Sequence, residues 1–531
     1  MKSKDPDQIV GLVSEVIPQH SCLIFCATKK NCENVSLLIC RFMPQALCEV
    51  HSDERKHLLE DLSASENEVC SVLSQTIPYG VAYHHSGLTS EERRLIEDAY
   101  TDGILCLLTC TSTLAAGVNL PARRVIIRSP YVGRQFISPA QYKQMAGRAG
   151  RKGHAETGES IIISDKAIDR ERLLNMLSAP IERCESALCC KDGHGIKHLM
   201  LSLIGLKICR NLAELRNFTN CTLQALQTQS QESLNLMVNE ALQSLINMRL
   251  VRLSKNDEEI KSEEVTDFSK YSLSVTTIGR ATFMGGIAVE DAFTLYKDIN
   301  TASDCLVVSS YLHLLFLCVP YESARDVSPD WQHFYTVYCR MSPSDRHCAN
   351  VVSVTEQSLI LRKIGRNVKF DFNHNRFYLS LILSNIMEGS KTIWDISREF
   401  NLSRGFVQNL IIASGAFCMN VIHFCKEIEL FWPYVSLLQE VQKKITLSSN
   451  VELNVLLEIP GVKIGRARQL HSKGYKTLAQ IAFAKPVDLL SDIKFISKKV
   501  ARSIISAAKL ILEEKAETLR QEAEELLTIP K

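Results

Sequence analysis

The sequence predicts a parallel α/β domain over residues 1–185, followed by mostly helical domains. Five short apolar runs rich in β-branched residues alternate with helical stretches there, beginning at residues 22, 81, 104, 124 and 159. This alternation is typical of a mostly parallel sheet wrapped by helices. Beyond residue 185 the periodicity is predominantly helical. The expected fold class is therefore an α/β lobe joined to α-rich domains.

Length and composition support several domains in one chain. The 531 residues are 46% hydrophobic, and a chain of this length exceeds what one core normally organises. The 19 cysteines form no C-x-x-C pair, so we expect no zinc site and a reducing compartment, the cytosol or the nucleus. No run of about eighteen apolar residues is present and the first residues are polar, so we expect neither a membrane span nor a signal peptide.

Polar segments follow the predicted strands, at the edge where an open parallel sheet binds its ligands. They are "ATKKNCE" after the first strand, "SGLTSEERR" after the second and "STLAAGVNLPA" after the third. Thr89 or Ser90 can cap the helix that follows the second strand. We expect His84 and His85 to pack or hydrogen-bond locally, because nothing places them beside a nucleophile.

Positive charge is concentrated in one stretch, although the net charge of the chain is only +2. Eight basic residues and no acidic residue occur between Pro121 and Gly153. Arg148 and Arg151 lie at the end of this stretch, in the glycine-rich segment "QYKQMAGRAGRKG". Such local charge predicts a phosphate-rich partner.

Three patterns organise the helical part of the chain. Helices followed by two strands with a polar turn indicate a winged helix within residues 186–285. The segment 286–445 is helical and contains a helix-turn-helix pattern, "IWDISREFNLSRGFVQNL". Within residues 446–531, "LLEIPGVKIGRARQL" fits a helix-hairpin-helix in which Pro460 and Gly461 form the hairpin.

Four segments resemble, in order and spacing, motifs IV, IVa, V and VI of the second RecA-like lobe of Ski2-like superfamily 2 helicases. They are "CLIFCATKKNCE", "HHSGLTSEER", "TSTLAAGVNLPA" and "QMAGRAGRKG". Two later segments, "RGFVQNLIIASGAFCMNVIHFCKEIELFWPY" and "IPGVKIGRARQLHSKGYKTL", resemble the branch of DNA helicases that includes helicase Q (HELQ) and the helicase part of DNA polymerase theta. The resemblance covers essentially the whole chain, and it implies that residues 286–445 are a ratchet domain closing a ring around single-stranded DNA.

The resemblance implies catalytic roles for three residues of the motif VI segment. Gln144 would orient nucleotide or water, and Arg148 and Arg151 would be arginine fingers, which raise phosphoryl-transfer rates by about 10³ to 10⁵. Surface salt bridges are the alternative for the two arginines. Gly117 and Asn119 are the nucleotide-binding candidates, because glycine lets the backbone approach a ligand and an amide hydrogen-bonds without charge repulsion.

DNA-binding candidates occur at two places in the α/β domain, and each has a structural alternative. Thr111 and Thr113 either contact phosphate or cap a helix. A predicted hairpin at about residues 124–141 separates the strands of the duplex in relatives, with Tyr131 and Phe136 stacking on the terminal base pair and Arg134 contacting phosphate. A plain surface hairpin is the alternative.

The helical domains supply the remaining DNA-binding candidates. Trp394, Arg398 and Arg404 are the candidates in the ratchet domain, unless Trp394 belongs to a core. The candidates of the helix-hairpin-helix share its basic, glycine-containing turn; they are Gly461, Lys463, Gly465, Arg466 and Arg468. This motif favours DNA over RNA and binds independently of sequence, with an affinity that falls as salt rises.

Two patterns that this class of ATPase needs do not occur in the 531 residues, namely the Walker A loop and a D-E-x-H strand end. We therefore expect ATP and Mg²⁺ to be held mainly by a first lobe outside this chain, and this chain alone to be inactive as an ATPase. We expect it to be a C-terminal fragment, a short isoform or a truncated gene model, with no metal site of its own.

The expected function is the C-terminal part of an ATP-dependent 3′ to 5′ DNA helicase in the nucleus. Its partners would be single-stranded and forked DNA and DNA repair or replication-fork proteins, with no membrane. The alternative is a non-catalytic DNA-binding or regulatory isoform. A Ski2-like RNA helicase is a more distant alternative, disfavoured by the helix-hairpin-helix.

Overall fold

A computed structural model describes most of residues 5–528 and divides them into two compact units, 1–438 and 439–531. Each unit is described by itself. The residues that the structure does not describe are 1–4, 6, 67–68, 116, 151–156, 165–166, 181–182, 190–192, 229, 256–257, 261–267, 367–371, 390, 449–454, 463, 494–495 and 529–531.

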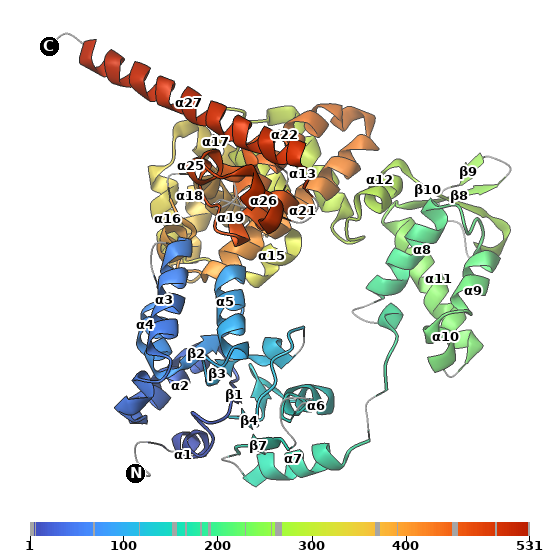
Figure 1. Ribbon diagram of the computed structural model, residues 1–531. Coiled ribbons are helices and arrows are strands. Elements are labelled where there is room, and N and C mark those ends of the chain that lie inside the picture. Colours follow the sequence, from blue (N-terminus) through green and yellow to red (C-terminus); the bar gives the residue numbers. More distant parts are fainter. Residues whose placement is uncertain are drawn as a thin grey trace. The chain divides into compact units, whose positions relative to one another are not determined.

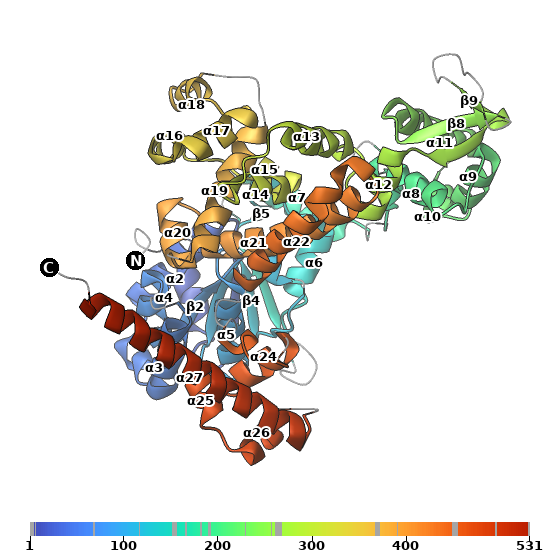
Figure 2. The same cartoon turned by 90° about the horizontal axis from the view of Figure 1, so that it is seen from above.

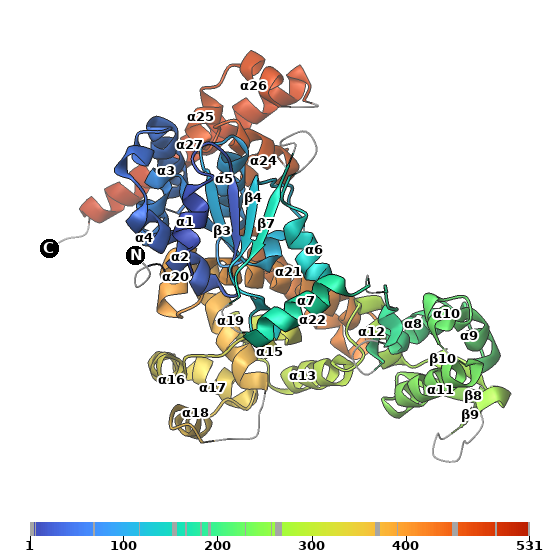
Figure 3. The same ribbon diagram turned by 90° about the horizontal axis from the view of Figure 1, so that it is seen from below.

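A five-stranded parallel sheet forms the core of the α/β lobe (Figures 1 and 3). Its order is β2-β3-β1-β4-β7, and all four pairings between neighbours are parallel. The strands are β1 (Cys22–Phe25), β2 (Val81–His84), β3 (Leu107–Cys110), β4 (Arg124–Ile127) and β7 (Glu159–Ile162). Every residue of the first four strands is buried, as expected for a sheet covered on both faces. The predicted α/β lobe with a parallel sheet is confirmed.

Helices connect the strands of this sheet. They are α1 (Ile9–Ser14), α2 (Lys29–Phe42), α3 (Ser52–Glu66), α4 (Ser71–Thr76), α5 (Ser90–Thr101), α6 (Pro139–Ala146) and α7 (Ala167–Ser178), with 3-10 turns at Gln45–Cys48, Ile77–Tyr79 and Ser112–Ala115 (η3). Thr89 caps α5 in a capping box: its hydroxyl accepts from the Glu92 N–H, and the Glu92 carboxylate accepts from the Thr89 N–H.

The predicted hairpin at 124–141 is shorter than expected. Residues 124–127 are a strand of the parallel sheet, whereas the antiparallel hairpin consists of β5 (Tyr131–Val132) and β6 (Gln135–Phe136). The reason is that residues 124–127 are wholly buried between two parallel neighbours, which leaves only the segment after Pro130 to turn back on itself. Gly133 adopts a φ of 61° in the turn.

The winged-helix region contains three strands instead of the predicted two. The strands β8 (Val251–Lys255), β9 (Glu258–Ile260) and β10 (Ser272–Val275) form an antiparallel sheet in the order β10-β8-β9 (Figure 1). The extra strand arises because the polar turn lies inside the segment that was assigned to one strand. The helices of this region are α8 (His194–Gly205), α9 (Leu212–Thr219), α10 (Leu223–Gln227), α11 (Gln231–Asn247) and α12 (Thr277–Gly285), with 3-10 turns at Ala187–Cys189 and Phe268–Lys270.

Residues 286–438 are helical, as predicted. Their helices are α13 (Ala292–Cys305), α14 (Leu312–Cys318), α15 (Tyr321–Asp326), α16 (Trp331–Arg340), α17 (Pro343–Val351), α18 (Glu356–Lys363), α19 (Phe372–Glu388), α20 (Ile393–Glu399), α21 (Arg404–Lys426) and the first part of α22 (Trp432–Ser448), with a 3-10 turn at Glu429–Phe431. The helices α20 and α21 form the predicted helix-turn-helix (Figure 2). Among the described residues, α21 is one helix with the length and composition of a membrane span. We regard it as a core helix, because it packs against α12, α14, α19 and α20.

The second unit contains the helix-hairpin-helix region. Its helices are α24 (Ile464–Ser472), α25 (Leu478–Ala482), α26 (Pro486–Asp492) and α27 (Lys498–Thr528). Apolar residues from all four helices form one core, into which Leu456 and Ile459 also pack.

A buried arginine joins four helices of the 286–438 region. Arg376 on α19 is fully buried, and its guanidinium donates to the Asp298 carboxylate on α13 and, at 3.1 Å, to the carbonyl oxygen of Phe316 on α14. Its Cζ also lies 4.3 Å from the ring centroid of Tyr321 on α15, whose hydroxyl donates to Asp298. The Arg376 charge is therefore compensated inside the core mainly by one carboxylate.

We predict that Asp298→Ala lowers the free energy of unfolding by about 3–5 kcal/mol, because it leaves the Arg376 charge buried without its partner. Thermal and urea unfolding followed by circular dichroism measure the loss. Asp304→Ala, at an exposed position of the same helix, is the matched control and should be nearly neutral. The double variant Asp298→Leu with Arg376→Met should recover most of the stability; a loss as large as that of Asp298→Ala would contradict the explanation.

Candidate nucleotide and DNA interface

The sheet topology has a switch point at the carboxyl ends of β1 and β4. The strands β1 and β4 are neighbours in the sheet. After β1 the chain continues to β2, at one edge of the sheet, whereas after β4 it continues to β7, at the opposite edge. Open α/β sheets bind ligands where neighbouring connections diverge in this way. Here the β5–β6 hairpin lies at that point, because the Gly133 N–H donates to the Ala27 carbonyl oxygen at 2.9 Å.

His84 is the last residue of β2, and it and the following His85 hold the loop after this strand. His84 Nε2 lies 2.7 Å from Glu97 Oε1, and both side chains are largely buried. The His85 ring stacks on Tyr83 with centroids 4.7 Å apart, and its Nδ1 accepts from the Gly87 N–H. These are local structural contacts, as the sequence led us to expect.

Glu33 connects this loop to α2. Its carboxylate lies 3.6 Å from His85 Nε2 and 2.7 Å from Lys30 Nζ. The nearby His85 ring and Lys30 hold the pKa of Glu33 below its ordinary value, against the opposing effect of burial. The carboxylate is therefore ionised at neutral pH, and it connects α2 to the loop after β2.

The motif V segment runs from the carboxyl end of β3 to the start of β4. Thr111 follows β3 directly, and its hydroxyl lies 2.9 Å from that of Thr113, which is exposed. Gly117 adopts a φ of 87° with nothing within 4 Å of where a Cβ would be, so the backbone conformation, rather than crowding, requires glycine. Asn119 is exposed. The segment thus presents hydroxyl, backbone and amide groups toward open space.

Arg148 of motif VI is bound to this same segment. Its guanidinium donates to the carbonyl oxygen of Ala115 through Nε, at 3.2 Å, and also to that of Val118. Gln144 precedes it at an exposed position of α6. Arg151, the other predicted finger, lies outside the described residues, so its position is not assigned.

The end of motif VI lies beside the start of β4. The Ala122 N–H donates to the Arg148 carbonyl oxygen at 2.9 Å, and the Gly150 N–H donates to the Ala122 carbonyl oxygen at 3.0 Å. A Cβ on Gly150 or on Gly158 would overlap the backbone of the other glycine, so this approach requires both. Motif V therefore begins with Thr111 at the carboxyl edge of the sheet. Arg148 binds the later part of the motif, where the chain runs back toward the amino end of β4.

The aromatic residues of the hairpin contact α7. Tyr131 and Phe136 meet edge to face with ring centroids 5.5 Å apart, and the Tyr131 hydroxyl donates to Asp169 Oδ1 at 2.9 Å. Arg172 lies over the Phe136 ring at 5.7 Å. Arg134, the remaining hairpin candidate, is exposed at the turn.

The ratchet candidates differ from the exposed contacts that the sequence suggested. Arg404 is buried, because its Nη1 pairs with Glu92 Oε1 of α5 at 2.5 Å and its Cζ lies 4.2 Å from the Trp394 ring centroid. Arg398 is exposed and lies 5.2 Å from the same ring. Arg404 thus joins the helix-turn-helix to the α/β lobe in this structure, and DNA contact by these residues stays a prediction.

The backbone of the helix-turn-helix also contacts the loop after β2. The Gly405 N–H donates to the Gly87 carbonyl oxygen at 3.0 Å, and the Ser90 N–H donates to Gln408 Oε1 at 2.7 Å. A Cβ on Gly405 would overlap the carbonyl oxygens of Ser86 and Leu88. We call the contact made by Arg404, Gly405 and Gln408 the docking contact.

The helix-hairpin-helix has the turn that its sequence predicted. Gly461 adopts a φ of 87°, and Arg466 Nη1 donates to the Gly461 carbonyl oxygen at 2.6 Å. Gly465 and Arg468 lie on α24. Lys463 lies outside the described residues. DNA contact by all of these residues stays a prediction.

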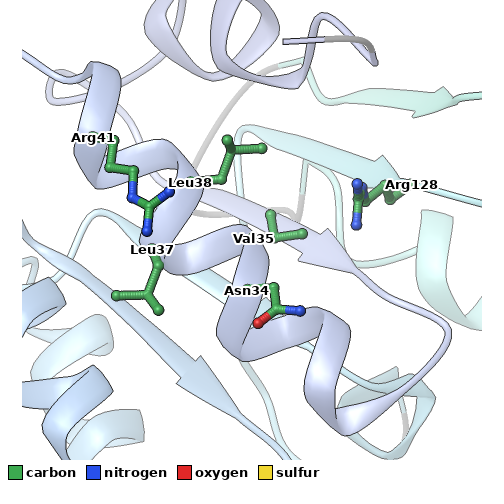
Figure 4. Close-up of a pocket in the computed structure, with 6 residues that line it drawn as sticks. All are labelled: Asn34, Val35, Leu37, Leu38, Arg41 and Arg128. Atoms are coloured by element: carbon green, nitrogen blue, oxygen red, sulfur yellow. The ribbon is translucent and has the colours of Figure 1, made fainter. Parts of the chain in front are cut away.

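A cavity of about 270 Å³ lies between α2 and the end of β4, away from the predicted site residues (Figure 4). Asn34, Leu38 and Arg41 of α2 line it together with Arg128, whose Nε donates to the Asp7 carboxylate at 2.7 Å. No predicted nucleotide or DNA residue lines this cavity. Among the described residues, no group of three or more His, Cys, Asp or Glu side chains is placed to hold a metal ion.

Four family models match successive parts of the chain. They are the helicase conserved C-terminal domain at 44–153, a helix-turn-helix domain at 158–252, the helical domain of the DNA polymerase Q helicase-like region at 289–445 and a SAM-like helix-hairpin-helix tandem at 453–510.

Curated relatives match over nearly the whole chain. Helicase POLQ-like from Homo sapiens is 43% identical over 100% of this chain and 48% of its own length, and Helicase POLQ-like from Drosophila melanogaster is 36% identical over 99% and 52%. The chain belongs to the helicase Q type of Ski2-like superfamily 2 helicases. ATP-dependent DNA helicase Hel308 from Methanocella arvoryzae is 27% identical over 94% of this chain and 64% of its own length. The chain spans about half the length of the Helicase POLQ-like proteins.

Three residues of this helicase Q-type chain matter to the site but were not singled out in the sequence. Glu92 completes the capping box of α5 and also pairs with Arg404. Gly405 is required by close backbone contact across 318 positions of sequence, and Asp169 accepts from a tyrosine 38 positions away. No local sequence pattern reveals such contacts. Gly405 alone could have been noticed, because a glycine directly after a predicted turn indicates a close backbone contact.

We predict that Gly405→Ala separates the docking contact and lowers the free energy of unfolding by about 1–3 kcal/mol, the usual effect of overpacking. Hydrogen exchange should accelerate at the Gly405 and Ser90 amides, which the contact protects. Gly11→Ala is the matched control, because Gly11 lies in α1 with nothing within 4 Å of a new Cβ, and it should leave both amides unchanged. Unchanged exchange in Gly405→Ala would show that the contact is not formed in solution.

Proposed function

We propose that this chain forms the second motor lobe and the DNA-handling domains of an ATP-dependent 3′ to 5′ DNA helicase. The helicase would act on single-stranded and forked DNA during DNA repair in the nucleus, with repair or replication-fork proteins as partners. One observation carries the proposal: motif V is bound by Arg148 on its return toward β4 and presents Thr111 and Thr113 at the carboxyl edge of the sheet. A movement of Arg148 would therefore be transmitted through motif V to Thr111 and Thr113, and the reverse.

ATP is the proposed cofactor, with Mg²⁺. Gln144 is exposed on α6, and Arg148 is half-buried two residues beyond the end of that helix, so we propose that an amide and a guanidinium from this segment contact a phosphate group. The Walker A and D-E-x-H patterns do not occur in its 531 residues, and the described residues offer no Mg²⁺ ligand cluster. A lobe carrying those patterns would hold the nucleotide, whose hydrolysis supplies the free energy, and Arg148 and Arg151 would stabilise charge on the transferring phosphoryl group.

DNA would follow the carboxyl edge of the sheet. The Thr111 and Thr113 hydroxyls are suited to phosphate oxygens. The hairpin is bonded to the segment after β1, and its exposed Arg134 adds positive charge. The helix-hairpin-helix would bind further phosphates through α24. This binding is independent of base sequence, which suits a protein that moves along DNA.

A non-catalytic DNA-binding or regulatory role is the second candidate. The observation that favours this role is that the Walker A loop, which holds the nucleotide phosphates in such ATPases, does not occur in the 531 residues. Both candidates require DNA binding, and they differ in whether Arg148 serves phosphoryl transfer.

One test of the proposed function concerns Arg148 in a protein that joins this chain to a P-loop lobe. Arg148→Ala should lower DNA-stimulated ATP hydrolysis by about 10³ to 10⁵ while leaving the affinity for single-stranded DNA nearly unchanged. Lys143→Ala, at an exposed position of α6, is the control and should retain hydrolysis. Equal losses of hydrolysis and DNA affinity in Arg148→Ala would assign this residue to DNA instead. Thermal unfolding identifies any loss that comes from releasing the motif V carbonyls.

The next prediction concerns this chain alone. It should bind single-stranded or tailed DNA of any sequence, with log affinity falling by roughly 0.7 per neutralised phosphate for each tenfold rise in salt. Lys463→Glu combined with Arg466→Glu should weaken binding and reduce the salt dependence. Lys443→Glu reverses one charge at an exposed position of α22 and should change neither quantity much. Fluorescence anisotropy measures both. A folded chain that shows no binding at low salt would refute the proposed function.

A further inference from the structure

The β5–β6 hairpin is too short to hold its own shape. Each of its strands has two residues, and even longer isolated hairpins are marginally stable in water. Its turn is fixed on one side by the hydrogen bond from the Gly133 N–H to Ala27, and its base closes through the Ile137 N–H, which donates to Pro130 at 3.1 Å. Neither bond restrains the two aromatic side chains.

Those side chains are restrained by α7. The Tyr131 hydroxyl donates to Asp169, a residue that is only 4% exposed, and Arg172 lies over the Phe136 ring. The hydrogen bond to Asp169 raises the pKa of Tyr131, so the phenol remains a proton donor throughout the neutral range. The rings also contact each other edge to face. We call this set of four residues the brace.

The brace changes which part of the hairpin is open to a ligand. Tyr131 and Phe136 are half-buried against each other and α7, whereas Gly133, Arg134 and Gln135 at the turn are all exposed. A terminal base pair that reached the hairpin would therefore meet a guanidinium and an amide before it met a ring. Both groups can donate hydrogen bonds to phosphates and base edges.

We propose that Tyr131 and Phe136 are positioning residues, which fix the hairpin to α7 through Asp169 and Arg172, and that Arg134 and Gln135 meet the DNA at a fork junction. The inference rests on the proposed function in strand separation. Its physical basis is rigidity: a wedge opposes the stacking of a base pair only if its own conformation is held by surrounding contacts. Asp169 and Arg172 provide that support from the first turns of α7.

Tyr131→Phe separates this role from direct stacking. The substitution keeps a ring that can stack on a base but removes the hydroxyl that binds Asp169. Asp169→Ala removes the acceptor and leaves both rings, while Asp169→Asn keeps an acceptor oxygen and serves as the conservative rescue. Loss of one charge-assisted hydrogen bond should raise the open population of the hairpin about tenfold, which hydrogen exchange at the Gly133 and Ile137 amides reports.

The test uses the 531-residue chain and forked DNA that carries 2-aminopurine at the first base pair of the junction. Binding is followed by anisotropy, and opening of the junction by the rise in 2-aminopurine fluorescence. We expect Tyr131→Phe and Asp169→Ala to lose the fluorescence rise and to gain amide exchange, with unchanged affinity for single-stranded DNA. Asp169→Asn should behave like the unsubstituted chain. Arg134→Ala should lose the fluorescence rise without any change in exchange.

Two outcomes would overturn the inference. A normal fluorescence rise in Tyr131→Phe would mean that the rings act directly on the DNA, and binding of the unsubstituted chain without any rise would mean that the hairpin does not open the junction. Failure of the unsubstituted chain to bind forked DNA at all would instead refute the proposed function. In that case amide exchange still shows whether the brace forms, so the two failures are distinguishable.

Discussion

The parallel pairing of β1 on both of its edges is the constraint on which the rest of the lobe depends. Because β3 and β4 flank it in the same direction, every connection must return to the amino end of the sheet before the next strand begins. All strand ends therefore collect at one edge, and motif V must travel from that edge back toward β4. The positions of Thr111, Arg148 and the hairpin follow from this one arrangement.

The buried arginines of the core and the arginine of the predicted site have different hydrogen-bond acceptors. Inside the protein, Arg376 and Arg404 are buried, and they form ion pairs with Asp298 and Glu92, respectively. At the predicted site, the carbonyl oxygens of Ala115 and Val118 accept from Arg148 and orient its guanidinium against motif V.

Local sequence patterns predicted the parts of the fold that depend on local chemistry. The five parallel strands, the helix-turn-helix and the glycine turn before α24 were all predictable, because burial, turn residues and helix caps are encoded within a few positions. The hairpin was predicted too long, since alternation of apolar and basic residues does not reveal that Arg124 is buried between two strands. Arg404 was expected near DNA because its partner, Glu92, is remote in sequence and no periodicity connects them. The predicted roles of the site residues in nucleotide and DNA binding rest on chemistry and resemblance.

The helix α21 has a mechanical consequence, because it is held at both ends by backbone contacts that only glycine permits. Gly405 meets the loop after β2 at one end, and near the other end Gly285 of α12 lies against Asn420 and Phe424. Its 23 residues make a rod of about 34 Å, so a tilt of about 10° about Gly405 displaces the far end by roughly 6 Å. A small rotation of α21 about its Gly405 end would therefore move the end that contacts α12 much further than the end that contacts the α/β lobe.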